Sequence, residues 1–121
     1  NNVIIYNYMI STQLETAINE SKLVLSRSGY TTIMDLVKLE KKAFFIPTPG
    51  QFEQKYLAKY LAEKHITPFS NQKDFTIEKL NDVTHYKGFS AIENKTNYKE
   101  LFALFERKWE FASKTIFTFY I

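Results

Sequence analysis

Three short apolar runs, each followed by a helical pattern, constrain the fold of this chain more than any other feature. The runs are "VIIYN" (3–7), "KLVLS" (22–26) and "KAFFIP" (42–47). Nearly continuous apolar runs with β-branched and aromatic residues are typical of strands buried on both faces of a parallel sheet. Apolar residues at helical spacing follow each run: Leu14, Ala17 and Ile18; Ile33, Leu36 and Val37; and Tyr56, Leu57, Tyr60 and Leu61.

Strand–helix alternation of this kind predicts an α/β fold, a Rossmann-like open parallel sheet with helices on both faces. We expect a capping box of Thr12 and Glu15 at the start of the first helix. The pattern continues with a short fourth strand at 66–70, a modest helix at 76–86 and a loop at 87–97. We therefore predict one domain, with the α/β part at 1–97 and a C-terminal helix at 98–121 packed on it.

Composition excludes several classes of protein. A net charge of +3 over 121 residues suits an anionic ligand or an acidic membrane surface, but is too small to indicate nucleic-acid binding. The absence of cysteine excludes disulfides and thiolate metal sites, and fits a reducing compartment such as the cytoplasm. No apolar run approaches the roughly 20 residues that span a bilayer. The chain begins on Asn1 without an initiator Met, so we expect it to be part of a longer protein.

The stretch "LVLSRSGYTTIMDL" (23–36) joins the second apolar run to the next helix, at the sheet edge where ligands bind in open α/β folds. Gly29 permits a tight turn and a close backbone approach, and the following helix N-terminus favours a phosphate, with Arg27 adding charge. Asp35 lies one turn after Thr32 on the same face, where a carboxylate can accept two hydrogen bonds from a ribose diol. The hydroxyls that could donate hydrogen bonds to the phosphate belong to Ser26, Ser28, Thr31 and Thr32. A polar helix cap with a solvated Asp is an equally good interpretation of this stretch alone.

A second polar loop, "IPTPGQFEQKY" (46–56), follows the third apolar run at the same edge. Glu53 and Gln54 fall near the start of the next helix, where an amide can both donate to and accept from sugar hydroxyls. Two neighbouring loops thus offer groups for a phosphate, a ribose and a second sugar. Three residues make the loop stiff or give it special backbone angles: Pro47, Pro49 and Gly50.

With both motifs at this separation, residues 3–70 resemble the nucleotide-sugar half of MurG-type glycosyltransferases, which have the GT-B fold. The resemblance implies that Thr32 faces the phosphates or ribose, Asp35 the ribose hydroxyls and Gln54 the transferred sugar. Two positions depart from the family pattern: Asp35 replaces the usual Glu, and Lys55 replaces a second Gln. The expected donor-binding residues are Ser28, Gly29, Thr31, Thr32, Asp35, Gly50, Glu53 and Gln54.

The resemblance also implies a function, inverting transfer of a sugar from a nucleoside-diphosphate donor, with a UDP-sugar as the family expectation. The helix N-terminus after Gly29 would stabilise the leaving diphosphate, so neither a metal nor a cofactor is required. The catalytic base is expected in an N-terminal acceptor domain outside these residues, which would leave the isolated chain inactive. Two alternatives stay open: a nucleotide-sugar epimerase of the same fold, and a non-catalytic donor-site subunit docked to a separate acceptor chain.

Further expectations concern partners and assembly. Cytoplasmic location is expected, with peripheral contact at the inner face of the membrane as an alternative, made by an amphipathic tail around Trp109. The family match places missing strands between 3–7 and 23–26, which leaves an unpaired edge in the sheet. We expect Val3–Asn7 to move in beside Leu23–Ser26, or a second copy to form a homodimer there. The aromatic tail from Tyr98 is the next segment expected to cover the exposed sheet.

Overall fold

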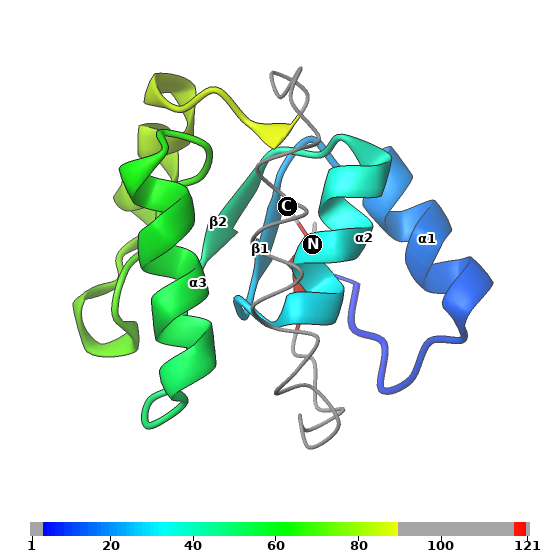
Figure 1. The fold of residues 1–121 in the computed structure, drawn as a ribbon. Helices are drawn as coiled ribbons and strands as arrows, with labels where there is room; N and C mark the ends of the chain where they lie inside the picture. The colour runs from blue at the N-terminus through cyan, green and yellow to red at the C-terminus, as the bar shows by residue number, and fades with distance from the viewer. Residues whose placement is uncertain (1–3, 90–117, 121) are drawn as a thin grey trace.

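The computed structural model describes residues 4–89 and 118–120 (Figure 1). Helices and strands alternate through the first half of this part of the chain, which confirms the predicted α/β class. Three of the apolar-spaced segments are α-helices, and two of the apolar runs are short strands. The elements are α1 (Ser11–Glu20), β1 (Val24–Ser26), α2 (Tyr30–Leu39), β2 (Ala43–Phe45), α3 (Phe52–Glu63), the 3₁₀ helices η1 (Gln72–Asp74) and η2 (Ile77–His85), and β3 (Thr118–Tyr120).

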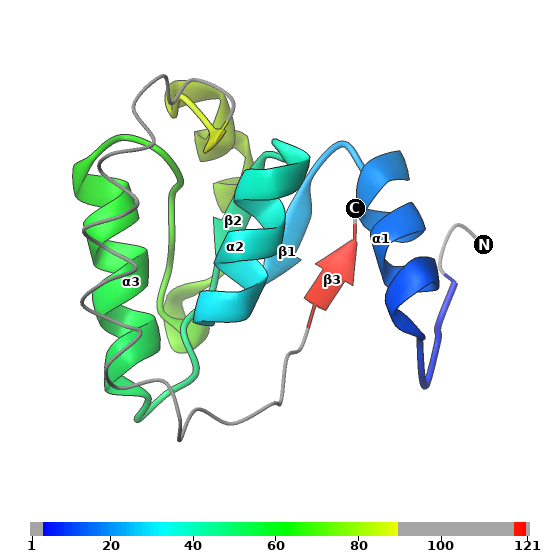
Figure 2. The ribbon, with the colours of Figure 1, turned by 45° about the vertical axis from the view of Figure 1, so that its right-hand side comes forward.

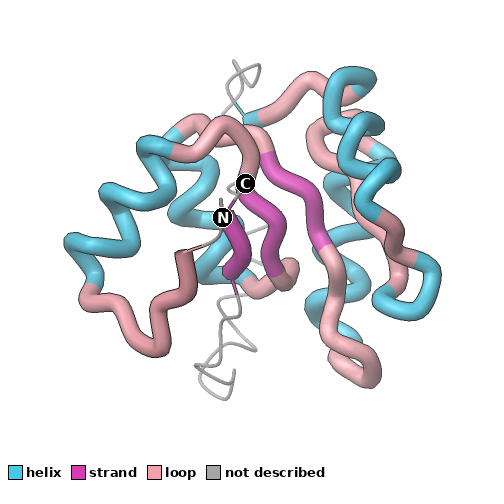
Figure 3. Tube along the Cα trace, turned by 180° about the vertical axis from the view of Figure 1, so that it is seen from behind, coloured by secondary structure: helices cyan, strands magenta, loops and turns pink. Residues whose placement is uncertain are grey.

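The described strands form one sheet in the order β2-β1-β3, side by side in Figure 3. β1 pairs with β2 in parallel, with Leu25 opposite Phe44. On its other edge β1 pairs with β3 in antiparallel orientation, with Leu25 opposite Phe119. The sheet is therefore mixed, and the prediction of a purely parallel sheet is correct only for β1 and β2.

The predicted fourth strand at 66–70 is reduced to a single parallel bridge between Phe45 and Phe69. The backbone N–H of Phe45 donates to the oxygen of Pro68, and that of Ser70 donates to the oxygen of Phe45, both at 3.1 Å. Pro68 itself has no N–H to give to a ladder, which limits pairing here. The segment still lies where a third parallel strand would lie, on the outer side of β2.

The prediction of a strand at 3–7 is wrong over its described residues, 4–7, which form neither helix nor strand. Ile4 and Ile5 are 77% and 82% exposed, so this apolar run does not contribute to the core. The edge of β1 that it was expected to pair with is taken by β3, which lies between β1 and α1 in Figure 2. Because β3 already pairs with this edge of β1, residues 4–7 have no edge there to pair with.

The predicted C-terminal helix is wrong for Thr118–Tyr120, which form β3. The rest of that prediction, including the expected membrane-facing surface around Trp109, lies outside the described residues. The expectation that the tail would cover the open sheet agrees with β3, although the cover is backbone pairing along an edge. Within the described part of the chain, no helix is long and apolar enough to cross a membrane.

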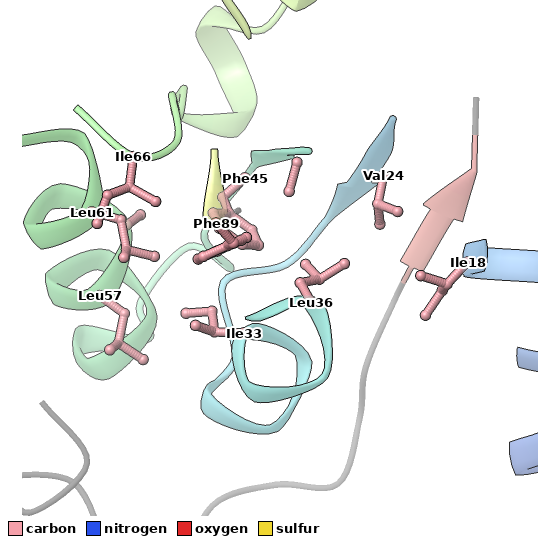
Figure 4. Packing of buried hydrophobic residues seen from close by; sticks show 11 residues of the cluster. Ile18, Val24, Ile33, Leu36, Phe45, Leu57, Leu61, Ile66 and Phe89 are labelled. Carbon is pink, nitrogen blue, oxygen red and sulfur yellow. The ribbon is translucent and has the colours of Figure 1, made fainter. Parts of the chain in front are cut away.

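Within the described residues, the main core lies between the sheet and the helices α1, α2 and α3. In Figure 1, α2 lies in front of the strands with α1 and α3 on either side of it. The buried side chains in Figure 4 come from each of these elements, and burial of such apolar surface is the main stabilising term in folding. The cluster consists of Ile18, Val24, Ile33, Leu36, Ala43, Phe45, Leu57, Ala58, Leu61, Ile66 and Phe89.

The opposite face of the sheet carries a smaller cluster, in which Leu25 and Phe44 pack with Val83 of η2. Successive residues of β1 and β2 thus point to opposite faces, and both faces are covered, as predicted from the continuous apolar runs. The α-helices, however, all contribute to one face, and the second face is covered by the 3₁₀ helix η2. The helix predicted at 76–86 is present at Ile77–His85 in this tighter form.

The expected capping box at the start of α1 is wrong. The helix begins at Ser11, so Thr12 already lies inside the first turn. The cap is formed two residues earlier, where the backbone N–H of Ile10 donates to Oε1 of Gln13 at 3.2 Å. Thr12 accepts, through its main-chain oxygen, a 2.9 Å hydrogen bond from the hydroxyl of Thr16.

Candidate functional site

The loops that follow β1 and β2 are joined by one buried hydrogen bond. Ser28, at the end of the β1–α2 connection, is fully buried, and its Oγ donates to the main-chain oxygen of Gln54 at 2.7 Å. Gln54 lies in the first turn of α3, so this bond fixes the start of α3 against the turn before α2. The prediction that both loops meet at one sheet edge is thereby confirmed. The Ser28 hydroxyl, however, already donates its proton to a hydrogen bond within the protein, so it does not donate to a ligand.

The β2–α3 loop is closed on itself by the side chain of Gln54. The backbone N–H of Thr48 donates to Oε1 of Gln54 at 2.7 Å. Between them Gly50 has a φ of 83°, the left-handed region that favours glycine, as the predicted special backbone angles require. Glu53 is exposed in the first turn of α3. The loop is therefore a compact unit that holds the Gln54 amide by its oxygen.

The start of α2 is the second feature of this edge. Gly29 is the N-cap, and the backbone N–H of Ile33 donates to its oxygen at 3.0 Å. Its φ of −72° and ψ of 148° suit any residue, so the turn does not use the conformational freedom of glycine. A Cβ added at Gly29 would meet no atom of the structure within 4 Å. Open space at the N-terminal end of α2 leaves room for close approach to the helix end, where N–H groups point outward.

Two threonines follow in the first turn of α2, and they differ in exposure. Thr31 is exposed, whereas Thr32 is 4% exposed. The Oγ1 of Thr32 is buried and has no hydrogen-bond partner among the described residues. Buried hydroxyls are nearly always paired in folded proteins, so a group of this kind needs an explanation.

Asp35 lies on the exposed surface of α2, one turn beyond Thr32. Thr32 and Asp35 were expected to share one face of α2. They do so only in part, because Thr32 is buried and Asp35 is exposed. Partial burial raises the pKa of Asp35 above its ordinary value; Lys38 opposes this effect, and the charge of Glu15 on α1 adds to it. An exposed carboxylate at this position is available as a hydrogen-bond acceptor.

Sequence reasoning treated Arg27 only as an added charge and missed its contacts. Its Nη1 donates to the main-chain oxygens of Ile46 at 3.1 Å and Pro47 at 3.4 Å, and its Nη2 donates to Oε1 of Gln72 at 2.7 Å. Arg27 thus contacts both the β2–α3 loop and η1, which follows the segment at 66–70. The available signal was a charged residue directly after a buried strand, together with the polar run "NQKD" (71–74) after the predicted fourth strand at 66–70.

Parallel strands whose connections meet at their carboxyl edge, one of them opening a helix N-terminus, are typical of the α/β class of nucleotide-binding domains. The sequence matches the glycosyltransferase family 28 C-terminal domain over residues 1–108, and the chain belongs to this family. In this MurG-like family the C-terminal domain binds the nucleotide-sugar donor. The resemblance inferred from the two loop motifs is therefore confirmed, whereas β3 lies beyond the matched residues. No curated protein and no solved structure significantly matches the chain.

Proposed function

We propose that the chain is the donor-binding part of an inverting glycosyltransferase that uses a nucleoside-diphosphate sugar, with UDP as the nucleotide. Membership of the family supports the donor class. The observation that carries the proposal is the bond between Ser28 and Gln54, because it fixes the helix end suited to a phosphate beside the amide suited to a sugar.

The diphosphate is assigned to the N-terminus of α2. The macrodipole and the outward N–H groups of a helix start favour an anion, and the space at Gly29 admits one without displacing a side chain. Thr31 adds an exposed hydroxyl. The buried hydroxyl of Thr32, which has no hydrogen-bond partner among the described residues, adds a second donor. Uncompensated charge on the departing diphosphate would be stabilised by these fixed dipoles during transfer.

The ribose is assigned to Asp35, whose exposed carboxylate can accept hydrogen bonds from two neighbouring hydroxyls. The shorter side chain relative to the family's usual Glu places the carboxylate closer to the helix. The two assigned positions are about one helical turn apart along α2, roughly 5.4 Å.

The transferred sugar is assigned to the β2–α3 loop. Since the N–H of Thr48 occupies Oε1 of Gln54, the remaining polar group of that amide is its NH₂, a donor to sugar oxygens. Glu53, exposed beside it, adds an acceptor for sugar hydroxyls. The acceptor substrate and the catalytic base are assigned to a partner domain or chain, so the residues described here bind and orient the donor.

The test is a titration of the chain with UDP, UMP and uridine, followed by amide chemical shifts. We expect affinity to fall in that order, because each lost phosphate removes contacts to the start of α2. Asp35→Ala should weaken UDP binding by about 1–3 kcal/mol, the cost of losing hydrogen bonds to a charged group. Asp82→Ala removes an exposed carboxylate from η2 and is the matched control. Equal affinity for uridine and UDP, or an unchanged affinity in Asp35→Ala, would contradict the proposal.

A further inference from the structure

Consecutive residues of the β1–α2 connection hold the two ends of the β2–α3 loop. Arg27 binds the oxygens of Ile46 and Pro47, where the loop begins, and Ser28 binds the oxygen of Gln54, where it enters α3. The Thr48 to Gln54 bond closes the loop between these two points. The position of the loop relative to the start of α2 is therefore set by one dipeptide.

The way in which Arg27 is paired explains why an arginine suits this position. Its described partners are main-chain carbonyls and an amide oxygen, so the guanidinium is held by dipoles rather than by a carboxylate. A planar fork of five donors can contact the loop through one nitrogen and η1 through another. A lysine ammonium is a point charge and cannot reproduce that geometry.

Gln72, the first residue of η1, holds the guanidinium of Arg27 from the segment that follows 66–70. Its Oε1 accepts the 2.7 Å bond from Nη2 and is 45 residues from Arg27 in the sequence. The remaining guanidinium nitrogen, Nε, is buried and has no hydrogen-bond partner among the described residues, so the bonds of Nη1 and Nη2 hold the group. Gln72 thus limits the rotation of the guanidinium about its side chain, and so fixes the nitrogen that reaches Ile46 and Pro47.

We propose that Arg27 and Gln72 are positioning residues that set the sugar-binding loop, and hence discriminate the donor sugar, without contacting the donor. The inference rests on the proposed function, in which Gln54 faces the transferred sugar. The phosphate site belongs to the start of α2, on the same connection as Arg27, so it does not depend on the contacts to the β2–α3 loop. Loosening these contacts weakens recognition of the sugar while leaving UDP binding intact.

The test compares Gln72→Ala with Gln72→Glu in the full chain, using UDP and UDP-N-acetylglucosamine as probes. Gln72 is exposed, so both variants are expected to fold. The measured quantity is the ratio of the Kd for UDP to that for UDP-N-acetylglucosamine. We expect Gln72→Ala to reduce this ratio by about threefold to tenfold, the effect of one hydrogen bond. Gln72→Glu retains an acceptor oxygen and should preserve the ratio, as should the neighbouring control Lys73→Ala.

A second measurement needs no ligand. Hydrogen exchange of the Thr48 amide should become faster in Gln72→Ala and stay unchanged in Gln72→Glu, because a loosened loop breaks the bond to Gln54 more often. Arg27→Lys should show the same faster exchange. If the wild-type chain binds UDP-N-acetylglucosamine more tightly than UDP and Gln72→Ala leaves both the ratio and the Thr48 exchange unchanged, the positioning role is wrong. If the wild-type chain binds neither probe, the proposed function fails, and the donor-sugar role fails with it.

Discussion

Ser28 and Gln54 are linked by a 2.7 Å hydrogen bond from a fully buried hydroxyl to a main-chain oxygen, and this bond couples the start of α2 to the start of α3. The two bonded residues are 26 positions apart in the sequence. The bond makes the carboxyl edge of β1 and β2 one structural unit, which a ligand contacting both loops requires.

Replacing Ser28 tests the strength of that coupling. Ser28→Ala removes the hydroxyl and should lower the free energy of unfolding by about 1–2 kcal/mol, measured by urea denaturation. Ser11→Ala, at the exposed start of α1, is the control and should change stability by less than about 0.5 kcal/mol. A cost in Ser28→Ala no larger than in the control would show that the buried bond does not join the loops.

The side chain of Gln54 is expected to have two separable roles. Gln54→Ala removes the acceptor of the Thr48 N–H and should speed exchange of that amide. Gln54→Glu keeps an acceptor oxygen, so exchange should stay slow, but it lacks the NH₂ donor and should reduce the gain in affinity that a sugar gives to UDP. Exchange and sugar affinity that change together in both variants would contradict this separation.

Asp35 should titrate above its ordinary pKa because partial burial disfavours the charged carboxylate. Its side-chain carbon, followed by NMR, should give a higher pKa in the folded chain than in urea. Glu15→Gln should lower the pKa of Asp35 by removing a nearby negative charge, and Lys38→Met should raise it. A raised pKa of Asp35 in Glu15→Gln, or a lowered one in Lys38→Met, would show that the effects of these charges are assigned wrongly.

The raised pKa also has a consequence for stability. The folded chain binds the Asp35 proton more tightly than the unfolded chain, so this group favours folding below its unfolded pKa and loses that contribution as pH rises through its folded pKa. Asp35→Asn should therefore be no less stable than wild type at neutral pH. If it unfolds more easily there, Asp35 is a structural residue.

The last strand should protect the sheet from association. Deleting residues 118–121 removes β3 and exposes one edge of β1, an unpaired row of backbone groups that favours pairing with another chain. Sedimentation velocity should show concentration-dependent association in the truncated chain. Deleting Ile121 alone keeps β3 and is the control. A truncated chain that sediments like the control at every concentration would contradict this role.

The sequence was informative where the pattern is local. The continuous apolar runs at β1 and β2 correctly predicted burial on both faces, because successive residues such as Val24 and Leu25 pack into different clusters. The helix after each polar loop followed from apolar spacing in the same way. Gly50 was predicted to have special backbone angles from its place beside two prolines, and its φ is positive.

Contacts between distant residues were beyond the reach of a single sequence. The run at 3–7 has the composition of a strand, but which segment pairs with β1 depends on competition for one edge, and β3 takes it. The contacts of Arg27 with Ile46 and Gln72 join positions 19 and 45 residues away, and no spacing rule connects them. The buried direction of the Ser28 hydroxyl likewise depends on where α3 begins in space.

The central claim is that a nucleoside diphosphate binds at the start of α2. The most direct test is to map amide chemical-shift changes while UDP is added to the isotopically labelled chain. We predict that the largest changes fall at Gly29–Thr32 and Asp35, with smaller ones in the β2–α3 loop, and that inorganic pyrophosphate shifts the Gly29–Thr32 amides but not the Asp35 amide. Largest changes at the start of α1, or no saturable change anywhere, would contradict the assignment of the donor site.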